Sequence, residues 1–250
     1  MNDQFMQFLT QKLSPDEVEQ LKAGIGQMFM GAQKREKTQK IERYRHLNTM
    51  ARPHETVFVG SSLMEQFPIN ELLLDENLPY IIYNRGIGGY TTQELLQTLD
   101  ACVYELQPDF VYINIGTNDM NAPDYAEQEL IERYRNILDK IRTHLPQAKL
   151  RIMAYYPVNP IVGEKDMYMK EALKVRTNAR ILSANAAVEK LAAEVGALFI
   201  NANAGITDDN GMLKAEYTIE GMHMYGDGYR PVLQALKPYL EADWQSRKTL

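Results

Sequence analysis

From residue 56 onward, short apolar runs alternate with longer stretches of helical periodicity, and this alternation restricts the fold more than any other feature. Five runs predict strands, and several are apolar on both faces, as strands of a covered parallel sheet are. They are Thr56 to Val59, Tyr80 to Tyr83, Phe110 to Ile115, Leu150 to Tyr155 and Ala197 to Ile200. Helical patterns cover Thr92 to Leu106, Tyr125 to Leu145, Val175 to Val195 and Gly228 to Leu240. The repeated order of strand and helix predicts an α/β fold with a doubly wound sheet of about five parallel strands.

The first fifty residues differ from the rest of the chain and predict a helical extension. Ser14 is a helix cap, Pro15 suits the first helical position, and Glu17 can return a capping-box bond. Residues 34–45 are rich in Lys and Arg, which indicates a solvated helix face; a lid or a homodimer contact stays open as a role for the extension. We therefore expect an extension over residues 1–50 and one domain over residues 51–250.

Composition argues against several kinds of partner. A net charge of -6 is unlike the clustered basic excess of nucleic-acid binders. Cys102 is the only cysteine and cannot form an internal disulfide, and no apolar run approaches the roughly 18 residues that span a bilayer. Because the first residues also lack the pattern of a secretory signal, we expect a cytoplasmic protein without stable membrane insertion.

Small or polar turns follow the first three predicted strands. They are Gly60-Ser61-Ser62, then Asn84 to Tyr90, then Gly116 to Asp119, and a fourth turn, Glu220 to His223, precedes the last helix. The site of a doubly wound sheet lies beyond the carboxyl ends of its strands. We therefore expect the four turns to meet at one edge.

The turns offer a candidate for each group that acyl transfer requires. Ser62 suits the nucleophile because it ends its turn nearest the following helix. Gly89 offers a backbone N–H that no side chain obstructs, and Asn118 offers a side-chain amide, so that both could join the Ser62 N–H in an oxyanion hole. His223 suits the base, since the ordinary pKa of histidine, about 6.5, permits proton exchange near neutrality.

With these residues in view, the chain resembles the SGNH hydrolases, also called GDSL esterases and lipases. The blocks "VFVGSS", "NRGIGGYTT", "NIGTND" and "EGMH" look like the serine, glycine, asparagine and histidine blocks of that family. The resemblance covers roughly residues 51 to 240 and looks closest to the platelet-activating-factor acetylhydrolase-like branch. It implies a flavodoxin-like three-layer sandwich and the roles given above to Ser62, Gly89, Asn118 and His223.

Two positions depart from the family pattern. Ser61 stands where the family commonly has the aspartate of its GDS motif. Because that aspartate is not one of the named catalytic groups, its replacement bears mainly on how the turn is held. Glu220 stands three residues before His223, where the family normally has aspartate. Glutamate carries the same charge on a longer stem, and some serine hydrolases use it. We expect Glu220 to orient His223, with Asp227 and a backbone carbonyl as alternatives.

The resemblance implies a serine esterase or acylhydrolase that acts on small ester substrates, acetyl esters foremost, without a cofactor or a metal. Four histidines, one cysteine and no HExxH pattern give no zinc site. Tyr90, Tyr155 and Tyr156 lie beside the motifs and could wall a substrate pocket, although aromatic residues at strand ends more often pack in a core.

Other functions remain open from the sequence. They include a longer-chain lipase or lysophospholipase, and a binding protein that keeps this fold without activity. The GxSxG elbow of α/β-hydrolases is absent because Met64 occupies the second glycine position. Gly86-Ile87-Gly88 begins a dinucleotide-binding GxGxxG, but Thr91 stands at the third glycine, so the motif is incomplete.

Overall fold

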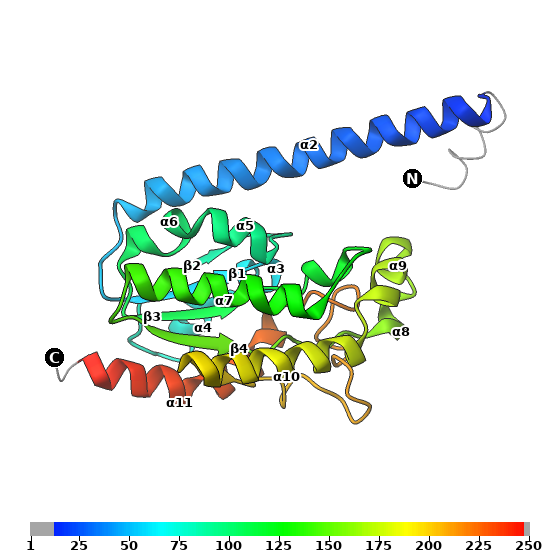
Figure 1. Ribbon diagram of the computed structural model, residues 1–250. Helices are drawn as coiled ribbons and strands as arrows, with labels where there is room; N and C mark the ends of the chain where they lie inside the picture. Colours follow the sequence, from blue (N-terminus) through cyan, green and yellow to red (C-terminus); the bar gives the residue numbers. More distant parts are fainter. Residues whose placement is uncertain (1–12, 248–250) are drawn as a thin grey trace. The chain divides into compact units, whose positions relative to one another are not determined.

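The structure, a computed structural model, describes residues 13–247 and has a five-stranded sheet at its centre. The strands are β1 (Thr56–Gly60), β2 (Ile82–Gly86), β3 (Phe110–Asn114), β4 (Lys149–Met153) and β5 (Leu198–Ile200). Neighbouring strands are parallel, in the order β2-β1-β3-β4-β5, which is the flavodoxin-like order (Figure 1). The predicted α/β fold with five parallel strands is confirmed.

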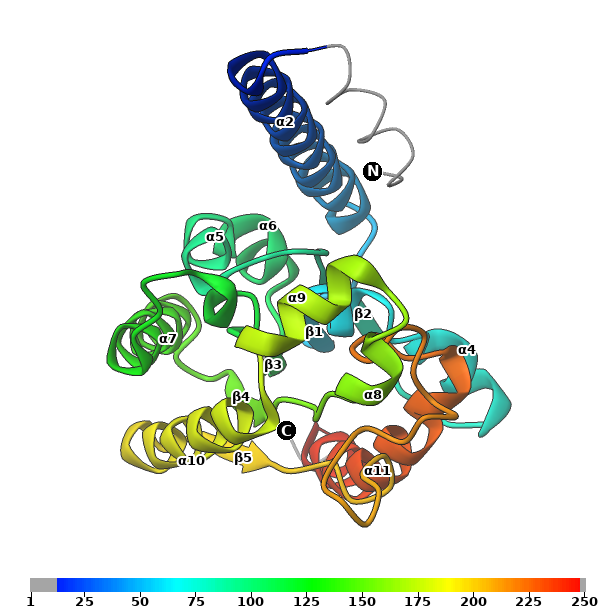
Figure 2. The same cartoon turned by 90° about the vertical axis from the view of Figure 1, so that its right-hand side faces the viewer.

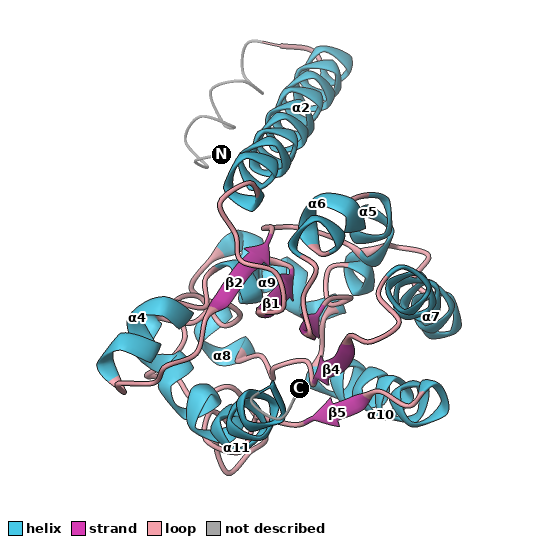
Figure 3. Ribbon diagram, turned by 90° about the vertical axis from the view of Figure 1, so that its left-hand side faces the viewer, coloured by secondary structure: helices cyan, strands magenta, loops and turns pink. Residues whose placement is uncertain are grey.

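Helices cover both faces of this sheet (Figures 2 and 3). On one face lie α5 (Thr92–Gln97), α6 (Leu99–Cys102), α7 (Glu127–His144) and α10 (Asn178–Val195), and on the other lie α4 (Ile69–Asp75) and α11 (Tyr229–Arg247). All residues of β1 and β3 are buried, because helices exclude water from both faces of the central strands. A cluster of aromatic side chains lies in the core on the α4 and α11 face. It consists of Phe58, Phe67, Tyr112 and Tyr229.

Short elements lie beyond the carboxyl ends of the strands. They are α3 (Ser62–Glu65), α8 (Pro160–Gly163), α9 (Met167–Val175) and the 3₁₀ turns η2 (Asp119–Asn121) and η3 (Gly226–Gly228). In Figures 1 and 2, α8 and α9 lie over this end of the sheet. The sequence pattern predicts neither α8 nor α9, and its next helical stretch begins at Val175, whereas α10 begins after the Thr177 cap.

Most predicted elements have somewhat different bounds in the structure, and the following two are examples. The single helix expected over Thr92 to Leu106 is divided into α5, α6 and the 3₁₀ turn η1 (Tyr104–Leu106). At the first break, the Thr98 hydroxyl donates to the carbonyl of Glu94 at 3.0 Å and so competes with the helical backbone. The strand expected over Tyr80 to Tyr83 begins two residues later and continues through Gly86.

The N-terminal helix α2 runs without interruption over Pro15–Asn48. Its predicted capping box is present, since the Ser14 N–H and hydroxyl each donate to the Glu17 carboxylate at 2.8 Å and the Glu17 N–H donates back to the hydroxyl at 3.4 Å. The chain divides into two compact units after Arg43, so the last residues of α2 belong to the unit that holds the sheet. The domain limits expected at residues 50 and 51 stay a prediction.

Candidate active site

The turn after β1 presents Ser62 at the carboxyl edge of the sheet. β1 ends at Gly60, Ser61 is the N-cap, and Ser62 is the first residue of α3. A Cβ on Gly60 would lie 2.1 Å from the carbonyl oxygen of Asn114, so only glycine lets β1 and β3 approach this closely. The Ser61 side chain is buried and makes no capping bond, whereas Ser62 is half-buried and reaches the site.

The segment Thr218 to Met224 folds back on itself and brings Glu220 to His223. The Thr218 hydroxyl donates to the carbonyl of His223 at 2.9 Å and accepts from the Gly221 N–H at 2.8 Å. Gly221 has φ of +98°, and an added Cβ would lie 2.5 Å from the carbonyl oxygen of Asn159. Glycine is therefore required for this turn, which the "EGMH" motif alone did not reveal.

His223 lies between the serine and the carboxylate. Its Nε2 is 2.9 Å from Ser62 Oγ, and its Nδ1 contacts Glu220 Oε1. A carboxylate only accepts hydrogen bonds, so Nδ1 donates and Nε2 faces Ser62 as an acceptor. The side chains of His223 and Glu220 are 22% and 15% exposed, which allows a substrate to approach while limiting solvent screening. Asp227, the alternative carboxylate, is exposed, and both ring nitrogens of the histidine already have other partners.

The loop after β2 and the turn after β3 are joined through Asn118. Its Nδ2 donates to the carbonyl of Tyr90 at 2.9 Å, and its Oδ1 accepts from Nη2 of Arg176 at 2.8 Å. An amide NH₂ has two hydrogens, so one remains for a ligand. Gly89, one residue before Tyr90, is exposed and has φ of +71°, a conformation that suits glycine.

Further residues fix these two segments, and the sequence motifs gave no role to these residues in advance. The Gly88 N–H donates to the Glu65 carboxylate at 2.6 Å, which links the glycine loop to α3. The Asp119 carboxylate accepts from the Thr92 N–H at 2.9 Å, which links the asparagine turn to α5. In "GTND" the aspartate therefore has a structural contact beside the asparagine that faces the site.

The three tyrosines proposed as pocket walls lie in the interior. Tyr155 is fully buried and its hydroxyl donates to the carbonyl of Ile115 at 2.8 Å, and Tyr156 packs in the core near Tyr229. A substrate pocket walled by Tyr155 and Tyr156 is therefore not supported, and the packing alternative describes both. Tyr90 is 4% exposed, and burial raises its pKa to about 12, so the clearest link of this residue to the site is its carbonyl.

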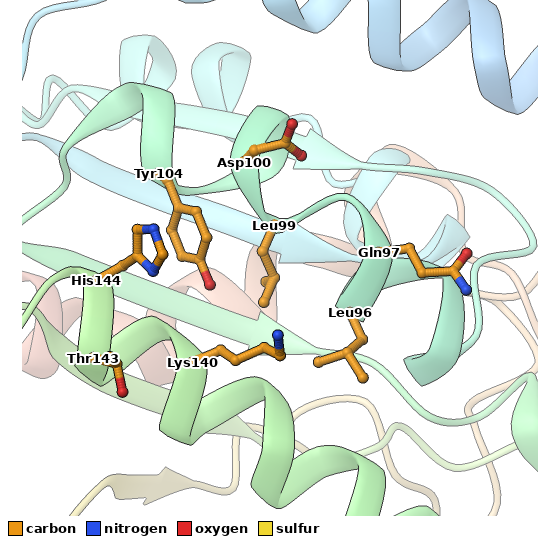
Figure 4. A pocket seen from close by; sticks show the side chains of 8 residues that line it. All are labelled: Leu96, Gln97, Leu99, Asp100, Tyr104, Lys140, Thr143 and His144. Atoms are coloured by element: carbon orange, nitrogen blue, oxygen red, sulfur yellow. The ribbon is translucent and has the colours of Figure 1, made fainter.

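Ser62 lines neither of two surface pockets, which differ in their relation to Asn118. The pocket in Figure 4, about 340 Å³, lies between α5, α6 and α7 and contains the stacked rings of Tyr104 and His144, whose centroids are 4.2 Å apart. It includes none of the candidate catalytic residues. A second pocket, about 270 Å³, has Asn118 in its wall together with Thr91, Gln93 and Arg133. Polar side chains thus surround the region next to the asparagine.

Among residues 13–247, no cluster of three or more His, Cys, Asp or Glu side chains is placed to hold a metal ion. None of the helices described there combines the length and the apolar character needed to cross a bilayer.

Comparisons with known proteins agree with the geometry. The model of the GDSL-like lipase/acylhydrolase family matches residues 58–230. Platelet-activating factor acetylhydrolase IB subunit alpha1 from Bos taurus is 26% identical over 187 residues, which cover 74% of this chain and 75% of that protein. A Streptococcus pneumonia structure described as a platelet activating factor is 32% identical with a TM-score of 0.77, and the match covers 87% of this chain and 99% of the other.

A more distant structure shares the fold. An acetylxylan esterase from Geobacillus stearothermophilus is 18% identical with a TM-score of 0.57, and the match covers 76% of this chain and 95% of that one. The family match spans most of the sheet-bearing unit and includes the serine, glycine, asparagine and histidine turns. The chain belongs to the GDSL-like lipase and acylhydrolase family and is a carboxylic ester hydrolase.

Proposed function

We propose that this protein is a serine esterase that cleaves short-chain carboxylic esters, acetyl esters foremost, through Ser62, His223 and Glu220. One observation carries the proposal: His223 contacts Ser62 with one ring nitrogen, at 2.9 Å, and Glu220 with the other. A base between a hydroxyl and an orienting carboxylate is the arrangement that activates a serine nucleophile.

The first half of the reaction forms an acyl-enzyme. Ser62 Oγ attacks the ester carbonyl carbon while its proton passes to His223 Nε2, and the carbonyl electrons move onto oxygen. When the tetrahedral intermediate collapses, the bond to the leaving alcohol breaks and His223 returns the proton to that alcohol. Glu220 stays ionised and stabilises the imidazolium through Nδ1.

The second half repeats these steps with water. His223 Nε2 takes a proton from water as its oxygen attacks the acyl carbon, and then gives a proton to Ser62 Oγ as the acid is released. In both halves the oxyanion would accept from the N–H groups of Ser62 and Gly89 and from Asn118 Nδ2. The Ser62 N–H suits this role because an N–H at the first helical position has no partner inside the helix.

The names of two similar proteins support a small acyl group. The relatives from Bos taurus and Geobacillus stearothermophilus are named an acetylhydrolase and an acetylxylan esterase. We therefore favour acetyl esters over the substrates of a longer-chain lipase or lysophospholipase.

Hydrolysis of p-nitrophenyl esters from acetate to decanoate tests this function. We expect the wild type to prefer acetate, and Ser62→Ala to lower kcat by about 10⁴-fold or more, since nucleophile removal in serine hydrolases costs this much. Ser61→Ala is the matched control and should stay within about twofold, because the Ser61 hydroxyl makes no hydrogen bond within the described residues. A wild type inactive on every ester would instead favour a binding protein with this fold.

Three further proposals concern the setting of the enzyme. We retain a cytoplasmic location, a domain boundary near residue 50, and a homodimer contact or lid formed by the extension. Exposed apolar side chains on α2, including Met28, Phe29 and Met30, support a contact role for that helix. Sedimentation at several protein concentrations would measure the oligomeric state.

A further inference from the structure

Arg176 is a buried cation next to the candidate oxyanion hole. It follows α9, is 2% exposed, and directs its guanidinium to three side chains. Nη2 donates to Asn118 Oδ1 at 2.8 Å, Nε donates to Asn121 Oδ1 at 3.3 Å, and Nη1 contacts the Met222 sulfur at 2.8 Å. All three partners are electrically neutral.

This arrangement is costly for the fold. Burial lowers the pKa of Arg176 to about 10, which reflects the loss of solvation of the charged form. Buried charges are ordinarily paired, yet the two carboxylates whose charges act on Arg176 have other partners. Asp119 accepts from Thr92, and Glu220 contacts His223. Arg176 is therefore a poor candidate for a residue kept only for stability.

The contact with Asn118 allows the buried guanidinium to fix the orientation of the Asn118 amide. An arginine only donates hydrogen bonds, so Asn118 must turn its oxygen toward Arg176 and its Nδ2 toward Tyr90 and the site. Without the arginine, the amide could rotate by a half turn and present an acceptor where a donor is needed. The positive charge on the oxygen side also polarises the amide and strengthens its N–H groups as donors.

The same guanidinium spans the two halves of the site. Met222 is the residue before His223, so Arg176 packs between the asparagine turn and the histidine turn. The cap of α8, which precedes α9 in the chain, also binds the histidine turn, since the Asn159 N–H donates to the carbonyl of Gly221 at 2.7 Å. Movement of Arg176 would therefore disturb the asparagine donor first and the base second.

We propose that Arg176 is a positioning residue of the oxyanion hole, which fixes the Asn118 amide with its N–H groups toward the reacting carbonyl through a bond to Oδ1. The inference rests on the proposed esterase function and deepens it. Arg176 acts through Asn118 and does not itself reach the substrate, as its burial requires.

A double-mutant cycle between Arg176→Gln and Asn118→Ala tests the proposal, with acetate ester hydrolysis as the readout. Asn118→Ala should lower kcat by about 10²- to 10³-fold, the range for loss of one oxyanion donor. Arg176→Gln should lower kcat by about 10- to 100-fold, a part of the same loss, with KM changed by less than about threefold. In the Asn118→Ala background, Arg176→Gln should cost less than about threefold, because the group that it positions is already gone.

Two further variants keep the test decisive. Arg176→Lys retains the charge and a hydrogen-bond donor, so it should recover part of the activity lost in Arg176→Gln. If Arg176→Gln does not fold, Arg176→Lys takes its place in the double-mutant cycle. Arg180→Gln is the matched control: Arg180 donates to the carbonyl of Met120 at 3.0 Å, close to Asn118 but not on its amide, and its kcat should stay within about threefold of wild type.

An independent readout uses phenylboronic acid, a reagent that forms an anionic tetrahedral adduct with an active serine. Its affinity should weaken in Arg176→Gln by a factor similar to the loss in kcat, because an adduct of this kind resembles the transition state. Equal losses from Arg176→Gln with and without Asn118 would overturn the inference, as would a raised KM with unchanged kcat. If Asn118→Ala itself has wild-type kcat, the failure lies in the proposed oxyanion hole instead.

Discussion

Two arginines at different places in this fold have opposite surroundings. Arg176, at the carboxyl edge of the sheet, contacts only neutral partners through its hydrogen bonds. Arg151, in β4, contacts the Asp243 carboxylate of α11 with Nε at 3.1 Å and also with Nη2, and Tyr112 donates to the same carboxylate at 2.8 Å. Burial lowers the pKa of Arg176 to about 10, whereas the bonds and charge of Asp243 outweigh burial and raise the pKa of Arg151.

The presence or absence of a carboxylate partner distinguishes a buried arginine that stabilises the fold from one that acts on the candidate active site. A buried cation with its own carboxylate balances the cost of burial and ties two elements together, here β4 and α11. A buried cation without one is retained where its field and its donors act on something else. Substitution of Arg176 should therefore lower turnover, whereas substitutions at the Arg151 and Asp243 pair should lower stability.

Glu220→Gln should have the largest of the remaining effects, a fall in kcat of about 10³- to 10⁴-fold on acetate esters. The amide has nearly the same shape but no charge, so it neither stabilises the imidazolium nor enforces the tautomer with hydrogen on Nδ1. Steady-state kinetics measures this loss. Glu220→Asp is the control, since it keeps the charge on a shorter stem and should lose less; equal losses in the two variants would show that stem length, and not charge, matters here.

Asp243→Asn should leave kcat within about twofold and lower the free energy of unfolding by about 2 to 3 kcal/mol, because Arg151 would then lack its counter-charge. We expect less than the roughly 3 to 5 kcal/mol typical of a broken buried ion pair, because the Arg151 side chain is 15% exposed and keeps some hydration. Urea unfolding measures the change. Glu194→Gln, which removes the exposed ion pair with Arg135, should alter stability little. A large loss of turnover in folded Asp243→Asn would break the distinction between the two regions.

Cys102 should show the smallest effect. It is fully buried, and burial raises the pKa of its thiol to about 12, so the fraction of thiolate at pH 8 is very small. Iodoacetamide should leave the folded protein unmodified and fully active, and should alkylate Cys102 only after unfolding in urea, as mass spectrometry would show. Rapid alkylation of the native protein with loss of activity would mean that this core opens.

The fold and the reacting groups follow from the sequence because each leaves a local pattern. Strands buried on both faces read as apolar runs, and turns at their carboxyl ends carry Ser62, Asn118 and the other polar residues. Arg176 has no such pattern, since it lies at the bend between α9 and α10 and contacts Asn118 only once the chain has folded. Tyr155 shows the converse: its position beside the motifs indicated a pocket wall, but its hydroxyl bonds inward to Ile115.

Reaction with a fluorophosphonate, followed by mass spectrometry of the peptides, would report whether Ser62 is the nucleophile. An activated Ser62 Oγ attacks phosphorus and expels fluoride, which leaves a stable phosphonyl ester on that residue. We expect modification at Ser62 in the wild type and in Ser61→Ala, none in Ser62→Ala, and much slower modification in Glu220→Gln. An unmodified Ser62 in the folded wild-type protein, or a label that persists in Ser62→Ala, would contradict this expectation.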